Sequence, residues 1–265
     1  MLGKLFKYEI KATARLFIPL YLTLLVFTLI NRLLLPLTNL DGQTSTFYGI
    51  ATGIGMFLYV ILMAGTMLVT LFVMIQRFYK NLLGDEGYLM FTLPVSSWKH
   101  ILSKLVTSMG WTLISSLVAC GSILILVSGH LNADFYRELS MVLAQIRDYL
   151  GTNSYLLVFE VILLALLSLA TTILTIYGAI SLGHLFNKYK LLVSFGMYLA
   201  LNAASQMVMM LFSQIVSGIA KHSLFLTGPS DISLFLFIAI LYYCIATAGF
   251  FLLTNFVLKK KLNLE

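Results

Sequence analysis

Six long runs of apolar residues constrain the fold of this chain more than any other feature. An α-helix needs about 20 apolar residues to cross a ~30 Å hydrocarbon core, and each run reaches that length. The 265 residues are 60% hydrophobic and 10% charged, whereas soluble domains are roughly 45–50% apolar and about 25% charged. This composition excludes a soluble globular protein, a disordered chain and, despite a pI of about 9.3, a nucleic-acid-binding domain. The predicted spans cover residues 16–37, 47–75, 102–127, 155–182, 191–219 and 232–258.

Residues 1–15 predict an additional amphipathic helix at the membrane surface. Its basic side chains recur at steps of three and four and share one face: Lys4, Lys7, Lys11 and Arg15. A basic face of this kind lies against anionic lipid headgroups. Glu9 lies on the apolar side, where we expect it to reach the interface or meet a lysine of a neighbouring segment, with contact to a functional partner as the alternative. The fold class expected is an all-α integral membrane protein, with this interfacial elbow helix before six spans and one domain over residues 1–265.

The distribution of basic residues predicts the orientation in the membrane. With the N-terminus inside, the inner segments hold 13 of the 17 Lys and Arg residues and the outer segments hold 4, which follows the positive-inside rule. Both termini are therefore expected to be cytoplasmic. The inner loops are then residues 76–101 and 183–190. The outer loops are residues 38–46, 128–154 and 220–231, and the extracellular loop 128–154 has apolar residues at helical spacing, which predicts a short amphipathic surface helix.

The sequence lacks the motifs of the common catalytic and cofactor-binding classes. It contains neither a P-loop nor an HExxH motif, and no pair of aspartates lies within a span. His100, His184 and His222 fall on different loops and form no metal-ligand set. Cys120 and Cys244 lie within apolar runs, where we expect small core residues rather than a disulfide. We therefore expect neither an enzyme nor a chain that binds a cofactor or a metal itself.

Glu160 is the one ionisable residue well inside a predicted span. Carboxylates within the membrane are costly and are candidates for a functional role. Because Glu160 lies near the start of its span, the helix dipole also favours a negative charge there. Both interpretations stay open: a structural carboxylate at a helix end, or a contact for substrate or an ion.

A polar stripe runs along one face of the fifth predicted span. Its members recur at steps of three and four: Asn202, Gln206, Met209, Ser213 and Ser217. Amide side chains are expensive against lipid, so this face should meet protein or a cavity. It predicts either the lining of a translocation path at a dimer interface or ordinary helix packing. The few charges of such a path suit an amphipathic or lipid-like cargo.

Two spans carry small residues at spacings that favour close helix packing. The second span has Gly49, Gly53, Gly55, Gly65 and Thr66. The fourth has Ser168, Thr171, Thr175 and Gly178. For both spans we expect helix–helix contacts.

The inner loop 76–101 is the most specific segment of the chain. It contains an apolar run too short to span the membrane: Tyr88, Leu89, Met90, Phe91 and Leu93. Gly84 and Gly87 allow the chain to turn, and Pro94 disfavours helix at the residue before it. Ser96 or Ser97 can cap the next span. The pattern predicts a short amphipathic helix lying across the inner ends of the spans, with an exposed apolar surface that needs a protein partner.

This loop resembles that of the ABC-2-type permeases, the membrane subunits of bacterial ABC exporters. The resemblance rests on Gly-Asp-Glu-Gly-Tyr-Leu at 84–89, Thr-Leu-Pro-Val-Ser at 92–96 and Ile-Leu-Ser-Lys-Leu at 101–105. The remaining chain matches in layout only, with an elbow helix, six spans and both termini inside. The amino-acid sequence of these three segments is similar to that of permeases from Gram-positive gut bacteria.

The resemblance implies that the loop is a coupling helix that docks on a separate ATPase subunit. The expected contact set is Asp85, Glu86, Tyr88, Leu89, Met90 and Phe91, with the inner loop 184–190 as a second contact. Two ATPase copies would bind ATP and Mg²⁺, and a second permease, identical or related, would complete the path in the bacterial cytoplasmic membrane. The expected substrate path includes Asn202, Gln206, Met209, Ser213 and Glu160. The alternative function is an ion-coupled secondary transporter that uses Glu160.

Overall fold

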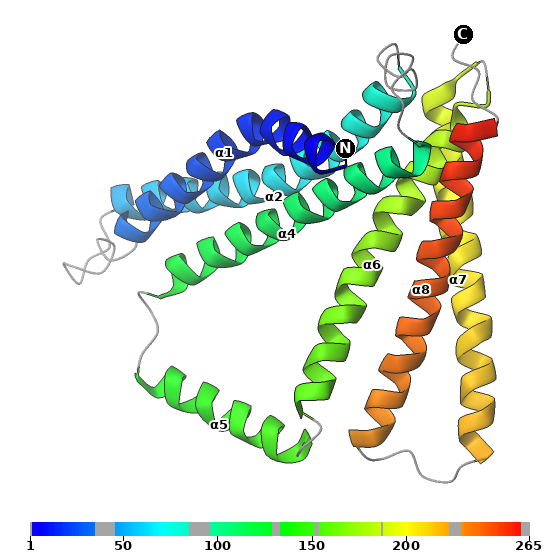
Figure 1. The fold of residues 1–265 in the computed structure, drawn as a ribbon. Coiled ribbons are helices and arrows are strands. Elements are labelled where there is room, and N and C mark those ends of the chain that lie inside the picture. Colours follow the sequence, from blue (N-terminus) through cyan, green and yellow to red (C-terminus); the bar gives the residue numbers. More distant parts are fainter. Residues whose placement is uncertain are drawn as a thin grey trace. The chain divides into compact units, whose positions relative to one another are not determined.

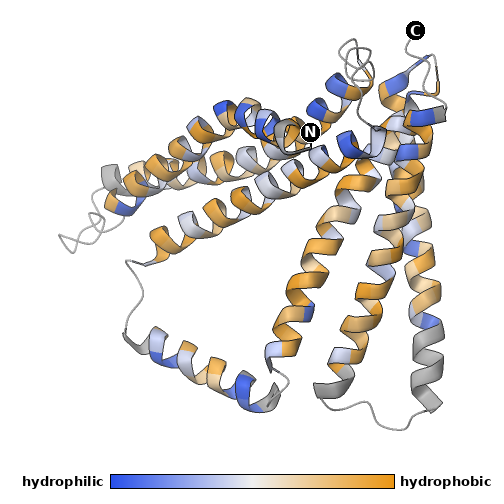
Figure 2. Cartoon of the chain, viewed as in Figure 1, coloured by the Kyte–Doolittle hydropathy of each residue, from blue (hydrophilic) through white to orange (hydrophobic). Residues whose placement is uncertain are grey.

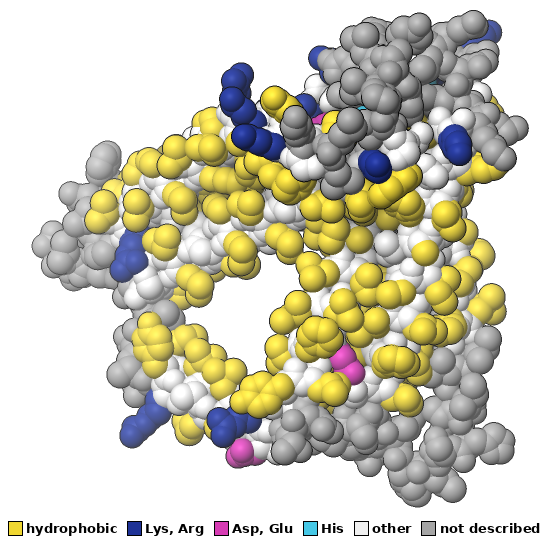
Figure 3. Space-filling view, viewed as in Figure 1, with side chains coloured by type: hydrophobic (Ala, Val, Ile, Leu, Met, Phe, Trp, Pro, Cys, Tyr) yellow, Lys and Arg dark blue, Asp and Glu magenta, His cyan; other side chains and the backbone are white. Residues whose placement is uncertain are grey.

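Helices make up nearly all of the part of the chain that the structure, a computed structural model, describes: residues 2–34, 46–84, 96–128, 133–150, 154–186, 188–222 and 229–260. The helices are α1 (Leu2–Leu34), α2 (Thr46–Leu82), α4 (Ser97–Val127), α5 (Ala133–Leu150), α6 (Ser154–Gly183), α7 (Lys190–His222) and α8 (Pro229–Lys260) (Figure 1). All but α5 are long and apolar enough to cross a membrane. These six helices are predominantly hydrophobic in Figure 2, and the face in Figure 3 is largely apolar along them. The predicted multi-pass, all-α membrane protein is confirmed at this level.

The N-terminal segment does not form a helix of its own. α1 runs without a break from Leu2 to Leu34 with Pro19 inside it, and Figure 1 shows a curved but continuous ribbon. The two-sided character predicted for residues 1–15 is present within this helix, because Lys7, Lys11 and Arg15 are exposed while Thr13 is buried. The boundary expected near residue 16 is therefore absent, and the orientation of the termini stays a prediction.

The helices that flank the predicted inner loop 76–101 are longer than the hydropathy pattern predicts. α2 continues past residue 75 to Leu82, where the amides of Leu83 and Gly84 both donate to the Tyr79 carbonyl (2.9 and 3.0 Å) and end the helix. α4 begins at Ser97 rather than near residue 102. The Lys99 amide donates to the Ser96 carbonyl (2.9 Å), which agrees with a cap at this serine.

Contacts between Cα atoms divide the chain into two compact units. Unit 1 holds Met1–Arg77 and Val106–Ser140, and unit 2 holds Phe78–Leu105 and Met141–Glu265. α2, α4 and α5 therefore each contribute residues to both units. The prediction of one domain over residues 1–265 stays a prediction.

Unit 1 joins α1, α2 and α4 through an aromatic cluster and a set of hydroxyl pairs. The rings of Phe17 and Trp111 stack with centroids 4.6 Å apart, and the Trp111 indole donates to the Thr13 hydroxyl (2.7 Å). The Ser115 hydroxyl on α4 pairs with Tyr21 of α1 (2.6 Å) and Thr70 of α2 (2.8 Å). Buried hydroxyl pairs of this kind hold helices together where lipid supplies no hydrophobic driving force.

In unit 2, α6 packs against both α7 and α8. The small residues predicted to mediate packing on this span do so: the Thr171 and Thr247 hydroxyls pair across α6 and α8 (2.8 Å), and a Cβ at Gly178 would lie 3.3 Å from Leu253 Cδ2. The packing prediction for the fourth span is confirmed.

The corresponding packing prediction for the second span holds for only some of its small residues. Gly55 faces Asn31 of α1, whose side-chain amide donates to the Gly55 carbonyl (3.1 Å). A Cβ at Gly49, Gly53 or Gly65 would meet no other described atom within 4 Å. These three glycines lie in open space within the described part of the chain.

Both cysteines are free, as expected, but the prediction that they are core residues is wrong. Cys120 and Cys244 are exposed. An apolar span in a bilayer has a lipid-facing side as well as a packed side, so an apolar neighbourhood in the sequence does not imply burial in protein.

Candidate coupling and transport sites

The residues predicted to contact an ATPase lie outside the described part of the chain. These are Asp85, Glu86, Tyr88, Leu89, Met90 and Phe91. The structure does describe the two arms that lead into this segment, the end of α2 and the start of α4. The two arms are therefore the part of the candidate coupling site whose geometry is defined.

Both arms pack onto α6. The ring of Phe78, at the end of α2, stacks on that of Tyr177 of α6 with centroids 3.9 Å apart and an interplanar angle of 8°, and both side chains are at most 1% exposed. The Tyr177 hydroxyl donates to the backbone carbonyl of Lys104 on α4 (3.4 Å). One α6 side chain thus contacts the arm on each side of the loop. A displacement of the loop would therefore reach α6 through well-packed side chains.

The connection between α6 and α7, which is the second loop predicted to lie inside, lies beside the same arm at His184. The His184 ring lies 5.2 Å from the Tyr79 ring of α2. Burial, and next the positive charge of Lys190, lower the pKa of His184, so the neutral imidazole is favoured. The chain turns into α7 at Tyr189, which has a φ of 58°. His184, the first residue of the predicted second contact 184–190, therefore lies next to the α2 arm.

The polar stripe of α7 faces away from the helices of its own unit. Gln206 and Ser213 are exposed, Met209 is 43% exposed and Asn202 is half-buried. The Ser213 hydroxyl donates to the Met210 carbonyl of its own helix (2.8 Å). No residue in the most hydrophobic stretch of α7 is buried by the described part of the chain. The stripe is thus not packed against α6 or α8, which disfavours the packing interpretation within one chain; the side chain of Ser217 lies outside the described residues.

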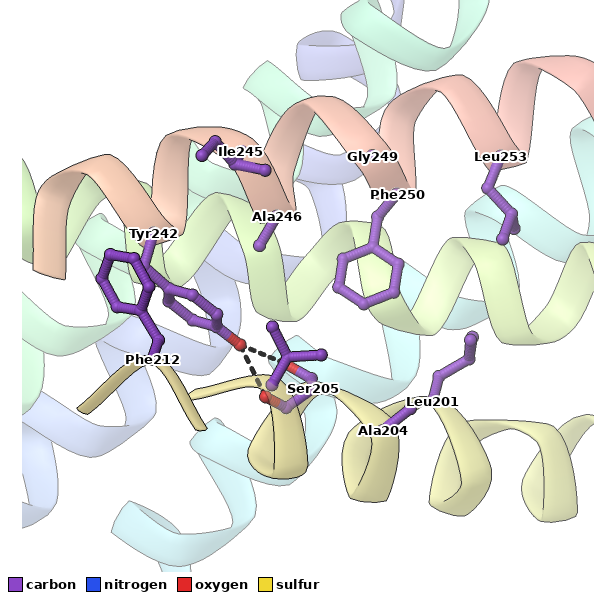
Figure 4. A pocket seen from close by; sticks show the side chains of 11 residues that line it. Leu201, Ala204, Ser205, Phe212, Tyr242, Ile245, Ala246, Gly249, Phe250 and Leu253 are labelled. Carbon is purple, nitrogen blue, oxygen red and sulfur yellow. Dashed lines mark hydrogen bonds between the residues drawn. The ribbon is translucent and has the colours of Figure 1, made fainter. Parts of the chain in front are cut away.

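A groove of about 340 Å³ lies between α7 and α8, on the neighbouring face of α7. The α7 residues that line the groove include Ser205, Val208 and Phe212. The next residue after each of these belongs to the polar stripe: Gln206, Met209 and Ser213. The stripe therefore lies about 100° around the helix from the groove. Figure 4 shows apolar walls around the one polar pair.

That pair consists of Ser205 and Tyr242. The Tyr242 hydroxyl donates to the Ser205 carbonyl (2.7 Å), and the two hydroxyls lie 2.8 Å apart. The hydroxyl of Tyr242 is therefore saturated by α7, and the groove presents mainly apolar surface. The hydropathy pattern does not predict this groove. The only feature of the sequence that could indicate it is the set of small residues that line it, Ala204, Ala246 and Gly249.

Glu160 is brought to α8 and not to the α7 stripe. It is 8% exposed, and the Ser233 hydroxyl donates to its Oε1 atom (2.7 Å). Its Oε2 atom is buried and has no hydrogen-bond partner among the described residues. Of the predicted substrate-path residues, those on α7 share one face and Glu160 lies elsewhere. The described residues contain no group of His, Cys, Asp or Glu suited to a metal ion.

Two charged side chains find partners that the sequence pattern did not identify. Glu9 meets Arg77 of α2 (3.9 Å). Arg32 of α1 donates to the carbonyl of Ile125 (3.0 Å) and to the Ser128 hydroxyl at the end of α4, where a cation also complements the helix dipole.

Comparison with family models, with curated proteins and with solved structures finds no match for this chain.

Proposed function

We propose that this chain is the permease subunit of an ATP-driven ABC exporter in the bacterial cytoplasmic membrane. The observation that carries the proposal is the attachment of both arms of the 83–96 connection to α6, in a chain with six helices suited to cross a membrane. A loop that bears an apolar run between two anchored arms is suited to receive force from a protein partner. The resemblance of residues 84–105 to ABC-2-type permeases supports the same function.

In this mechanism the chain binds no nucleotide and a separate ATPase supplies the energy. Two ATPase copies bind ATP and Mg²⁺, and their closure moves the segment that contains Asp85, Glu86 and Tyr88 to Phe91. Phe78 and Tyr177 carry that displacement to α6, and the helices packed on α6 follow. The ATPase dimer acts by binding one arrangement of the permease more tightly than the other.

A second permease completes the path by covering the α7 stripe. The exposed amide of Gln206 and the half-buried amide of Asn202 would be costly against hydrocarbon. Amides donate and accept hydrogen bonds, so the same stripe on an identical copy, or a polar face on a related permease, satisfies them. The cargo passes along Asn202, Gln206, Met209 and Ser213, and the scarcity of charge there fits an amphipathic or lipid-like molecule.

Co-purification from native membranes tests the proposal. The tagged chain is extracted in mild detergent with ATP and Mg²⁺, and bound proteins are identified by mass spectrometry. We expect an ATPase with the wild type and its loss from the double variant Glu86→Arg, Leu89→Asp. The matched control, Glu138→Arg with Ala144→Asp in α5, makes the same charge changes at exposed positions away from the apolar face of that helix and should retain the ATPase. Absence of any ATPase from the wild type would overturn the proposal.

A second candidate function rests on the half-satisfied carboxylate of Glu160. A buried oxygen without a described hydrogen-bond partner, inside a span, suits a site for a proton or a cation in an ion-coupled carrier. Liposomes that contain the chain alone, loaded with a pH-sensitive dye and placed under a proton gradient, test this alternative. Proton flux that needs no ATPase and is lost in Glu160→Gln, but not in Glu138→Gln, would favour the carrier. No flux with the wild type would exclude proton coupling.

A further inference from the structure

We propose that α5 lies in the lipid–water interface of the bilayer, with the face that bears Phe135, Leu139 and Val142 turned into the acyl chains. This inference concerns a connection between two spans and does not depend on the proposed function. Figure 2 shows α5 as a helix of mixed hydropathy, unlike the six apolar helices. It is absent from the helices suited to cross a membrane.

Most apolar residues of α5 lie on one face and most polar residues on the other. At 100° per residue, four of the large apolar residues fall within about 100° of one another, Tyr136 borders this face and Met141 lies on the polar side; the four are Phe135, Leu139, Val142 and Leu143. The residues on the opposite side are Arg137, Ser140, Ala144, Arg147 and Asp148. A helix with low overall hydropathy and a well-separated apolar face is the type that lies in the plane of the interface.

The rest of the described chain does not cover this apolar face. Phe135, Leu139, Val142 and Leu143 are each 44–57% exposed, and every residue of α5 whose burial is described is exposed. The apolar face therefore needs an occupant from outside the described chain.

The connections on either side of α5 determine what that occupant is. Five residues, 128–132, separate α5 from α4, and three, 151–153, separate it from α6. At no more than ~3.6 Å per residue, these connections reach about 18 and 11 Å. Because α5 does not cross, the end of α4 and the start of α6 lie at the same membrane surface. Both ends of α5 are thus held beside that surface, which places the headgroup region within reach of its whole length.

The charge of α5 indicates which force holds it there. The segment 133–150 has two arginines, Arg137 and Arg147, and three acidic residues, Asp134, Glu138 and Asp148, for a net charge of 2 − 3 = −1. Attraction to anionic lipid therefore does not drive docking, in contrast to the basic face predicted for residues 1–15. Insertion of the apolar face is sufficient, so zwitterionic lipid should support it.

Spin-label accessibility in the full chain tests this placement. Single cysteines are introduced at apolar positions, Leu139→Cys and Leu143→Cys, and at matched polar-face positions, Ser140→Cys and Ala144→Cys, in a background with Cys120→Ala and Cys244→Ala. The variants are reconstituted in phosphatidylcholine vesicles, and collision rates with oxygen and with a water-soluble nickel complex are measured. All four positions are exposed, so the labels should be tolerated; equal elution volumes on gel filtration check the fold.

We expect oxygen to collide more often than nickel at positions 139 and 143, and the reverse at 140 and 144. The ratio should be unchanged when a fifth of the lipid is replaced by phosphatidylglycerol. Nickel access at all four positions would overturn the proposal in favour of a helix in water. Low access of both reagents at 139 and 143 would also overturn it, because a protein surface would then cover the face, and oxygen preference at all four would place α5 inside the bilayer core.

Discussion

Gly183 lies where the end of α6 meets the start of α7, too close for any larger side chain. A Cβ at this position would lie 2.6 Å from the Cα and 2.7 Å from the backbone nitrogen of Ser194. Backbone atoms cannot rotate aside as a side chain can. The contact fixes the α6–α7 connection, which packs beside the α2 arm of the coupling loop.

Gly183→Ala should therefore lower the free energy of unfolding by about 1–3 kcal/mol, the usual cost of overpacking. Gly110→Ala is the matched control, because a Cβ there meets nothing within 4 Å and alanine favours helix. Thermal unfolding of both variants in the same detergent measures the difference. An equal midpoint for the two variants would contradict the close contact at Gly183.

His184 should make the stability of the chain sensitive to mild acid. Burial and Lys190 lower its pKa in the folded chain, whereas in the unfolded chain it titrates near ~6.5. The unfolded state then binds more protons below that pH, so stability falls as the pH drops through ~6.5 toward the folded-state pKa. Between pH 7.5 and 5.5 the wild type should lose more thermal stability than His184→Gln. Parallel losses in the two proteins would exclude this role.

At the scale of the elements, α6 contacts both loop arms, and the proposed coupling depends on this contact. Tyr177 contributes a buried ring to the stack with Phe78 and a hydroxyl to the α4 backbone. Tyr177→Ala should cost about 3–5 kcal/mol of stability, as for other buried aromatic truncations. Tyr177→Phe keeps the ring and should cost about 0.5–1.5 kcal/mol. Thermal unfolding of the two variants checks this order, and similar costs for both would show that the stack contributes little.

The sequence predicts the presence of these elements better than their ends and partners. Apolar periodicity locates six spans because hydrophobic length is a local property. It ends α2 too early, because Arg77 and Lys80 mark a loop while Phe78 and Leu82 are buried through contact with distant parts of the chain. The basic stripe of residues 1–15 predicted a separate N-terminal helix, yet α1 continues to Leu34.

The candidate site shows the same limit. The stripe on α7 follows from spacing alone, but spacing does not say whether its face meets α6, α8 or another chain. The partners of Glu160 and Tyr242 lie 73 and 37 residues away in sequence. Such pairs arise from tertiary packing, and no local pattern identifies them.

At the scale of the whole molecule, the proposal of a second permease places another subunit on the exposed face of α7. Gln206→Cys, in the background without native cysteines, should be joined by a short bis-maleimide to a second permease in native membranes. The product would be twice the mass of the chain for a homodimer, or a mixed adduct for a related permease. Leu117→Cys on α4, which is 71% exposed, is the control and should stay monomeric. Efficient labelling at 206 without any adduct would contradict the interface.

The most direct test of the account is to ask which protein touches the coupling segment in the native membrane. A photo-reactive amino acid is placed at Leu89 and, as a control, at Tyr155, which is 87% exposed at the start of α6. After irradiation with ATP and Mg²⁺ present, the adducts are purified and identified by mass spectrometry. The account predicts that position 89, and not position 155, is joined to an ATPase with a P-loop. An adduct from position 89 only to lipid or to other membrane proteins would contradict it.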